Sequence, residues 1–249
     1  MKRVLLVLVA LALLAPTAFA DVTVTTSISI LTAAMTADGT MTTYAKGSKF
    51  LSDSSVAGQS VSILSDAATK QQWTINHGTK TIEPLDAAKA MAALPISFGD
   101  AKVSVTPNGQ KKDLLGRSCE GYTIDVSIPA TIGGETITMR MAGPAWVAKE
   151  GPGVAEYKAS NKAFTDVGMS TSILAQGPQG KGMAAATKAL ADAGVVLEQE
   201  LKMTIEGGGQ MAQVMGQAAG ATITMKVTAI TTDPIPDAKF ALPEGYTKK

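Results

Sequence analysis

Cysteine and histidine are almost absent from this 249-residue sequence, in which Cys119 and His77 are the sole residues of these types. A single cysteine cannot form a disulfide within the chain, and the same counts exclude a structural zinc site built from several such ligands. His77 lies in an Asn-His-Gly turn pattern, where side chains are usually exposed. We therefore interpret it as a turn residue rather than the base of a Ser-His-Asp or Cys-His site.

Aromatic residues and excess charge are also scarce. Aromatic side chains make up 4% of the chain, and 22 basic residues stand against 21 acidic ones. Without a basic excess there is no electrostatic attraction to nucleic acid, and so few rings argue against a base-stacking surface. Because recognisable acid/base partners are lacking as well, we predict a protein that is not an enzyme, uses no cofactor and binds no nucleic acid.

The N-terminus has the pattern of a secretory signal. Two basic residues precede the apolar run Val4–Leu14, and Ala18–Ala20 supplies small residues before a cleavage site. The apolar run is shorter than the roughly 20 residues that a bilayer core requires. We predict that residues 1–20 are a signal peptide cleaved after Ala20 and that residues 21–249 form a single β-rich domain. The mature protein is then periplasmic or extracellular, with no transmembrane segment.

Alternating apolar and polar side chains indicate β-strands along most of the mature chain. The pattern is clearest at Val22–Ile30, in a hairpin within Leu115–Val147, and after Val195. In that hairpin we expect Tyr122 and Trp146 to be buried. Short strands joined by turns at this spacing predict a mainly antiparallel sheet.

Three segments have helical patterns instead. Asp86–Leu94 is rich in alanine and ends before a proline, and Val154–Val167 and Gly182–Ala193 flank a Gly/Pro-rich loop. The latter two define a helical insert at about residues 151–193. The expected fold class is α+β: a curved, mainly antiparallel sheet that forms an unclosed half-barrel, with helices covering its concave face.

Two features have alternative chemical interpretations. Gly177–Gly182 is glycine-rich but lacks the spacing of a phosphate-binding loop, and we interpret it as an inter-helix loop that can act as a hinge. Cys119 is either a reactive thiol or a buried small hydrophobe. Arg117 is the one basic residue close to Cys119 in the sequence, so few neighbouring charges would lower the pKa of the thiol. We therefore expect Cys119 to be buried.

Methionine is abundant, with 12 residues in the chain. Met139 and Met141 share one strand face with an isoleucine, and Met203 shares its face with Leu201 and Ile205. Thioethers can bind copper(I), whereas methionine mixed with aliphatic residues is typical of a core. A flexible apolar pocket fits the same pattern. We therefore predict a core or a pocket and no metal site.

Three motifs together resemble a known family. They are Gly116-x-x-Cys119-x-x-Tyr122, Trp146-Val147 and Phe240-x-x-Pro243-x-Gly245-Tyr246. With the signal peptide, they are similar to a secreted bacterial domain-of-unknown-function family of the DUF4412 type, related to the LolA/LppX-like lipoprotein carriers. The resemblance implies a LolA-like half-barrel with helices over an apolar concave face. Relatives of that fold carry acyl chains of lipoproteins or lipids, whereas the motif residues themselves are expected to be structural.

We therefore predict a non-enzymatic periplasmic or secreted carrier or sensor that binds an apolar, acyl-chain-like ligand between sheet and helices. The partner would be a lipid or a lipoprotein acyl chain. The alternative is a structural or protein-interaction domain of the cell envelope, with a filled core and no ligand. The predicted ligand-binding side chains all lie on apolar faces of period-two strands: Tyr122, Ile124, Val126, Ile137, Met139, Met141, Leu197, Leu201, Met203, Met225 and Val227.

Overall fold

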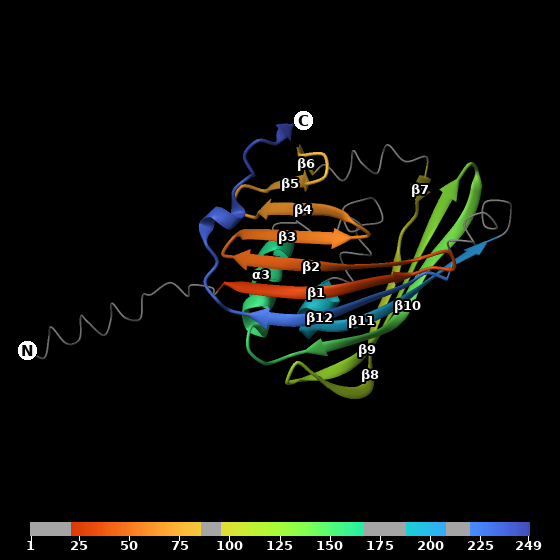
Figure 1. Ribbon diagram of the computed structural model, residues 1–249. Helices are drawn as coiled ribbons and strands as arrows, with labels where there is room; N and C mark the ends of the chain where they lie inside the picture. Colours follow the sequence, from red (N-terminus) through yellow and green to blue (C-terminus); the bar gives the residue numbers. More distant parts are fainter. Residues whose placement is uncertain (1–20, 86–95, 167–187, 208–219) are drawn as a thin grey trace, which may run out of the picture.

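The computed structural model describes residues 21–85, 96–166, 188–207 and 220–249 (Figure 1). The predicted signal peptide and the predicted helix at Asp86–Leu94 lie outside these ranges. The strands are β1 (Val22–Leu31), β2 (Thr36–Lys46), β3 (Lys49–Val56), β4 (Gln59–Asp66), β5 (Gln71–Asn76), β6 (Thr81–Pro84), β7 (Ile96–Phe98), β8 (Lys102–Leu114), β9 (Arg117–Ile132), β10 (Glu135–Ala148), β11 (Val195–Gly207), β12 (Thr222–Thr231) and β13 (Thr247–Lys248).

These strands form one 13-stranded sheet in the order β13-β6-β5-β4-β3-β2-β1-β12-β11-β10-β9-β7, and β8 also pairs with β9. The strand pairings are antiparallel, except that β13 pairs parallel to β6. The order runs from one edge strand to the other without closing, so the sheet is open. In Figure 1 the long strands β9 and β10 sweep away from the plane of β1–β4, which makes the sheet strongly curved.

The predicted helical cover of the concave face is wrong. Helix α3 (Val154–Asp166) confirms the first helix of the insert, and only residues 188–193 of the second fall in the described part, where they are helical. Helix α3 contacts β2 and β11. A helix of 13 residues is about 20 Å long, and strands lie about 4.8 Å apart, so it reaches across roughly four strands. The described part of the chain is a large open antiparallel sheet with little helix.

The β8–β9 hairpin explains the motif around Cys119. Leu115 and Gly116 both have positive φ, 51° and 69°, as a two-residue hairpin turn requires. Cys119 is 0% exposed and Tyr122 is 8% exposed, although strict alternation would place residues three apart on opposite faces. The register shift in the β8–β9 pairing places its extra residues in β8, between Pro107 and Lys111, whereas β9 pairs with β10 without a break. Both faces of β9 are therefore covered at this point, where the adjacent Gly121 and Tyr122 are both buried. The motif residues are therefore structural.

Strand β3 is covered on both faces. Phe50 and Leu51 are 3% and 5% exposed, and successive side chains of a strand point to opposite faces. Phe50 belongs to a cluster that includes Val154 of α3, here called the α3 cluster. Leu51 packs with Phe240, which ends the 3₁₀ helix η2 (Asp237–Phe240). The C-terminal segment, residues 232–249, is therefore a second cover that the sequence pattern did not predict.

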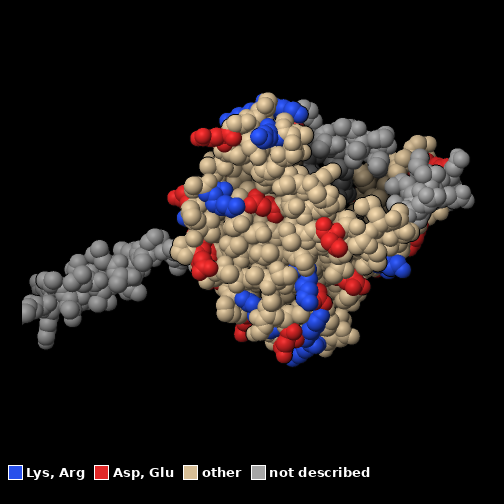
Figure 2. Space-filling model, viewed as in Figure 1, with Lys and Arg blue, Asp and Glu red and all other residues tan. Residues whose placement is uncertain are grey.

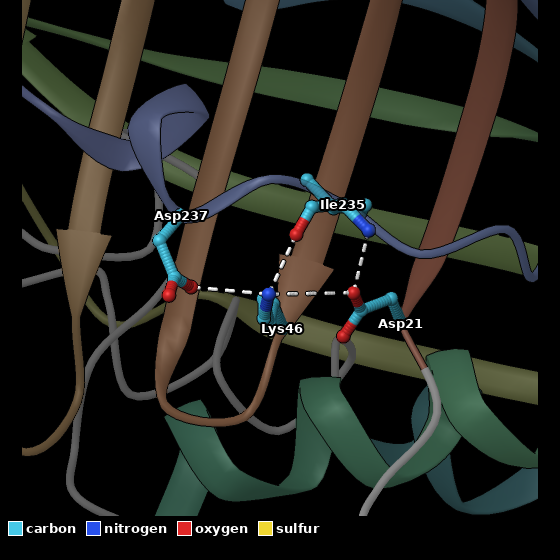
Figure 3. A network of polar contacts seen from close by, with 4 residues as sticks. All are labelled: Asp21, Lys46, Ile235 and Asp237. Atoms are coloured by element: carbon cyan, nitrogen blue, oxygen red, sulfur yellow. Dashed lines mark hydrogen bonds and ion pairs between the residues drawn. The ribbon is translucent and has the colours of Figure 1, made fainter.

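Polar contacts fasten the C-terminal segment where it passes the ends of β1 and β2 (Figure 3). Lys46 Nζ lies 3.0 Å from the Asp237 carboxylate and 3.7 Å from that of Asp21, and it donates to the Ile235 carbonyl at 2.6 Å. The Ile235 N–H donates to Asp21 at 2.6 Å. The hydrogen bond between Lys46 and Asp237 raises the pKa of the lysine and lowers the pKa of the carboxyl.

Candidate functional site

The predicted ligand-binding side chains lie together on one face of β9, β10, β11 and β12. Val126 is directly opposite Met141, and Met141 is directly opposite Met203. Leu201 pairs with Ile223 of β12, which is two residues before Met225. Directly paired residues share a face, as do residues two apart in a strand. The same reasoning places the whole predicted set on this face: Tyr122, Ile124, Val126, Ile137, Met139, Met141, Leu197, Leu201, Met203, Met225 and Val227.

Exposure divides this face into two parts. The buried part consists of Tyr122 (8%), Ile124 (3%), Val126 (3%), Ile137 (1%), Leu197 (1%) and Val227 (6%). The half-buried part, here called the half-buried band, consists of Met139, Met141, Leu201, Met203 and Met225. Leu197 and Val227 belong to the α3 cluster, and the band continues the same face along β11 and β12, beyond that cluster. The apolar side chains thus pass from a packed core into a partly accessible surface.

The chemistry of the half-buried band is apolar. The residues paired with its members include Ile205 opposite Met139 and Ile223 opposite Leu201. Ile28 and Gln199 lie on either side of Met225, and the Gln199 amide donates to the Met225 sulfur at 3.1 Å. Such a surface can hold an apolar chain by contact. It presents polarizable thioethers rather than the acid, base or nucleophile that a reaction would need.

The opposite face of the sheet has a different character. In Figure 2 the part turned to the viewer is mostly uncharged, and Lys, Arg and acidic side chains are scattered around it. Strand β1 contributes Thr23, Thr25 and Ser27 to this face, because they alternate with Val22 and Val24 of the α3 cluster. Hydroxyl groups in water are already hydrated, so this face is less suited than the half-buried band to an apolar ligand.

His77 lies in a turn, as predicted, but it is half-buried rather than exposed. Its Nε2 lies 2.6 Å from Ser62 Oγ, and its Nδ1 lies 2.9 Å from the Tyr246 hydroxyl. Ser62 donates to the Asp53 carboxylate at 2.7 Å, and Lys239 Nζ lies 2.9 Å from the same carboxylate. A Ser-His-Asp triad needs a carboxylate on the second imidazole nitrogen. Tyr246 occupies that position, and Ser62 is 2% exposed, so the network fastens the C-terminal segment.

Sequence reasoning missed this network because its members are far apart in the chain. His77 and Tyr246 are separated by 169 residues, and no local sequence pattern predicts that they are in contact. The one indication that Tyr246 has a structural role was its position in the C-terminal motif. That motif has a packing role, since Phe240 is buried and Tyr246 packs against the same cluster.

Cys119 and Arg117 lie next to the start of α3. Burial raises the pKa of the Cys119 thiol, whose Sγ donates to the Arg117 carbonyl at 3.6 Å. The Arg117 side chain, 8% exposed, donates to the Leu115 carbonyl at 2.9 Å and to the Pro152 carbonyl at 2.5 Å. These contacts confirm the predicted burial of Cys119. They also make Arg117 a link between the β8–β9 turn and the loop that precedes α3.

The predicted hinge at Gly177–Gly182 lies outside the described residues. Within the described ranges, no helix is both long enough and apolar enough to cross a membrane. The same part of the chain contains no group of three or more His, Cys, Asp or Glu side chains placed to hold a metal ion.

No family model matches the chain, and neither does any curated protein. In structure it is similar to a DUF1329 family protein from Desulfovibrio piger (8% identity, TM-score 0.37) and to a LolA superfamily protein from Nitrosomonas europaea (6%, 0.32). A third similar structure, from Vibrio parahaemolyticus, is a domain assigned to outer-membrane lipoprotein sorting (8%, 0.33). Each alignment covers 90% of both chains. Identities and TM-scores this low establish neither a ligand nor a family, and the DUF4412-type assignment has no match among these comparisons.

Proposed function

We propose that this protein is a non-enzymatic carrier or sensor that binds the acyl chain of a lipid or lipoprotein. The half-buried band supports this proposal: Met139, Met141, Leu201, Met203 and Met225 continue a buried apolar face yet stay partly accessible. A contiguous apolar surface that is not fully buried is a common mark of a binding site. Unbranched methionine side chains adapt to ligands of different shape, which suits a carrier that accepts several acyl chains.

The physical basis of binding would be burial of methylene groups. Each CH₂ group removed from water contributes about 0.8 kcal/mol, so several methylenes along the band suffice for useful affinity. An acyl chain needs no hydrogen-bonding partner along its length, and the aliphatic neighbours of the band provide none. Specificity would then depend on the shape and length of the apolar surface rather than on polar recognition.

The second candidate is a structural or interaction domain without a ligand. It is favoured by the buried part of the same face, since Ile124, Ile137 and Leu197 are 3%, 1% and 1% exposed. Side chains packed to that degree leave no room for a ligand, as is usual in protein interiors. The two candidate functions therefore differ only in whether the half-buried band binds a ligand.

Titration with a fluorescent fatty-acid probe separates them. Leu201 belongs to the band, whereas Lys202 beside it in β11 is exposed and points to the opposite face. We expect Leu201→Asp to weaken binding by more than about tenfold, because a charged group in an apolar contact must be desolvated. Lys202→Asp is the matched control and should bind as the wild type does.

Both variants need circular dichroism and urea unfolding to show that the fold is retained. Organic extraction of the purified protein, followed by lipid mass spectrometry, gives independent evidence for a bound lipid. If the wild type shows no saturable binding and extraction yields no lipid, the carrier proposal is wrong and the structural alternative stands.

A further inference from the structure

Three methionines of the half-buried band are close enough to act together. Met139 and Met141 are two residues apart in β10 and so share a face, and Met203 lies directly opposite Met141 in β11. Cβ atoms of directly opposite residues are about 4.5–5.5 Å apart, and same-face neighbours along a strand are about 6.6–6.8 Å apart. The methionine side chain has three rotatable bonds. The three sulfur atoms can therefore converge on one point above the sheet.

The side chains around this trio are aliphatic. Met139 pairs with Ile128 on one side and Ile205 on the other, and Met141 pairs with Val126 on the side away from Met203. At these bordering positions the donor set consists of thioethers alone, without carboxylate or imidazole. Calcium and magnesium require oxygen ligands, whereas soft thioether ligands select copper(I). The composition of the cluster therefore points to one class of ion.

The trio is partly exposed, although Met141 also packs against the buried cluster of Ile124, Val126, Ile128 and Ala145. Ile137, two residues before Met139 in the same strand, is 1% exposed, whereas Met139, Met141 and Met203 are all half-buried. Each of these methionine side chains thus keeps part of its surface accessible. The single thiol, Cys119, is 0% exposed within the α3 cluster, so it does not compete for an ion in the folded protein.

We propose that Met139, Met141 and Met203 form a three-thioether binding site for a copper(I) ion. The sequence pattern favoured a core or pocket because these residues alternate with polar ones beside aliphatic neighbours. The structure changes that interpretation, since Met141 and Met203 are directly paired across two strands, Met139 is their same-face neighbour, and none of the three is fully buried. The site does not depend on acyl binding: it needs the three sulfur atoms, whereas an acyl chain needs the length of the band.

Anaerobic titration with copper(I), in competition with the chromophoric chelator bicinchoninate, tests the site. We expect one equivalent of copper(I) per chain and, by X-ray absorption, coordination by sulfur only. Met141→Leu and Met203→Leu keep the apolar volume, and each should weaken copper(I) affinity by more than about tenfold, since even residues that merely support metal ligands contribute that much.

Two control variants separate this site from other sulfur atoms. Met35, 56% exposed and outside the band, provides a lone accessible thioether, so Met35→Leu should bind copper(I) as the wild type does. Cys119→Ala, with its fold checked by circular dichroism, should also retain binding. The proposal is overturned if the wild type fails to compete with the chelator, if both methionine variants keep wild-type affinity, or if binding is lost only with Cys119.

The outcome is distinct from that of the acyl-chain test. Wild-type protein that binds copper(I) but no fatty-acid probe would support the metal site and contradict the carrier proposal. Protein that binds the probe but does not compete for copper(I) would overturn the metal site alone.

Discussion

Strands β3 and β10 belong to the same sheet but meet different surroundings. In β3 the adjacent residues Phe50 and Leu51 are both buried, because the α3 cluster lies on one face and the C-terminal segment on the other. In β10, Met139 and Met141 stay half-buried on the face where Ile137 is buried. Both strands carry apolar side chains, so their pattern alone does not decide which of them form the core. What covers each face decides it.

The largest expected effect is the slow reaction of Cys119, in the α3 cluster, with a thiol reagent, because this cluster is buried whereas the half-buried band is partly accessible. We expect native Cys119 to be alkylated more than about 1,000-fold more slowly than in unfolded protein, because labelling requires an opening that costs several kcal/mol. Burial also raises the pKa of the thiol, which lowers the fraction of reactive thiolate. Labelling rates with and without denaturant at one pH measure this. Native labelling within about tenfold of the unfolded rate would show that the cluster is open.

Removal of the second cover of β3 should have the next largest effect. Phe240 is 7% exposed, and Phe240→Ala should lower the free energy of unfolding by about 3–5 kcal/mol, as truncation of a buried aromatic residue does. Glu244 in the same segment is exposed, so Glu244→Ala should change stability by less than about 0.5 kcal/mol. Urea unfolding measures both. If both variants were equally stable, the C-terminal segment would not be part of the core.

Within β10 and β11 the contrast can be measured by two truncations. Ile137 is 1% exposed, and Ile137→Ala should cost about 2–5 kcal/mol. Met203 is half-buried, so Met203→Ala removes less buried surface and should cost about 1–2 kcal/mol. The comparison uses urea unfolding of both variants under the same conditions. A larger cost for Met203 than for Ile137 would mean that the band is core after all.

The smallest effect is expected where the C-terminal segment is fastened by Lys46. The hydrogen bond from Lys46 holds the pKa of Asp237 below its ordinary value of 3.8. Because the folded-state pKa is below the unfolded one, the contact stabilises the protein above the unfolded pKa, and this contribution is lost as the pH falls through the folded value. Asp237→Asn should therefore slightly lower the free energy of unfolding at pH 7 and not at pH 2. Equal losses at both pH values, measured by urea unfolding, would contradict this origin.

Local patterns along the chain were sufficient to predict the strands and the apolar face of each one. Side-chain alternation is a property of the extended backbone, so the patterns around Val22, Tyr122 and Leu197 place these residues correctly on buried faces. The turn at Leu115 and Gly116 is equally local, since it depends on two residues that adopt positive φ. The open antiparallel sheet follows from many such strands joined by short turns.

What covers each face of the sheet depends on contacts between distant parts of the chain. The predicted helices do not cover the concave face, because where a helix lies on a sheet depends on long-range packing that its own periodicity does not encode. The contacts of Phe240 with the Leu51 cluster and of Tyr246 with His77 likewise join distant parts of the chain. Trp146 carries the same expectation of burial as Tyr122 but is only partly buried. Burial is a relation between a side chain and its neighbours in space, whereas a sequence pattern describes only the side chain and its neighbours along the chain.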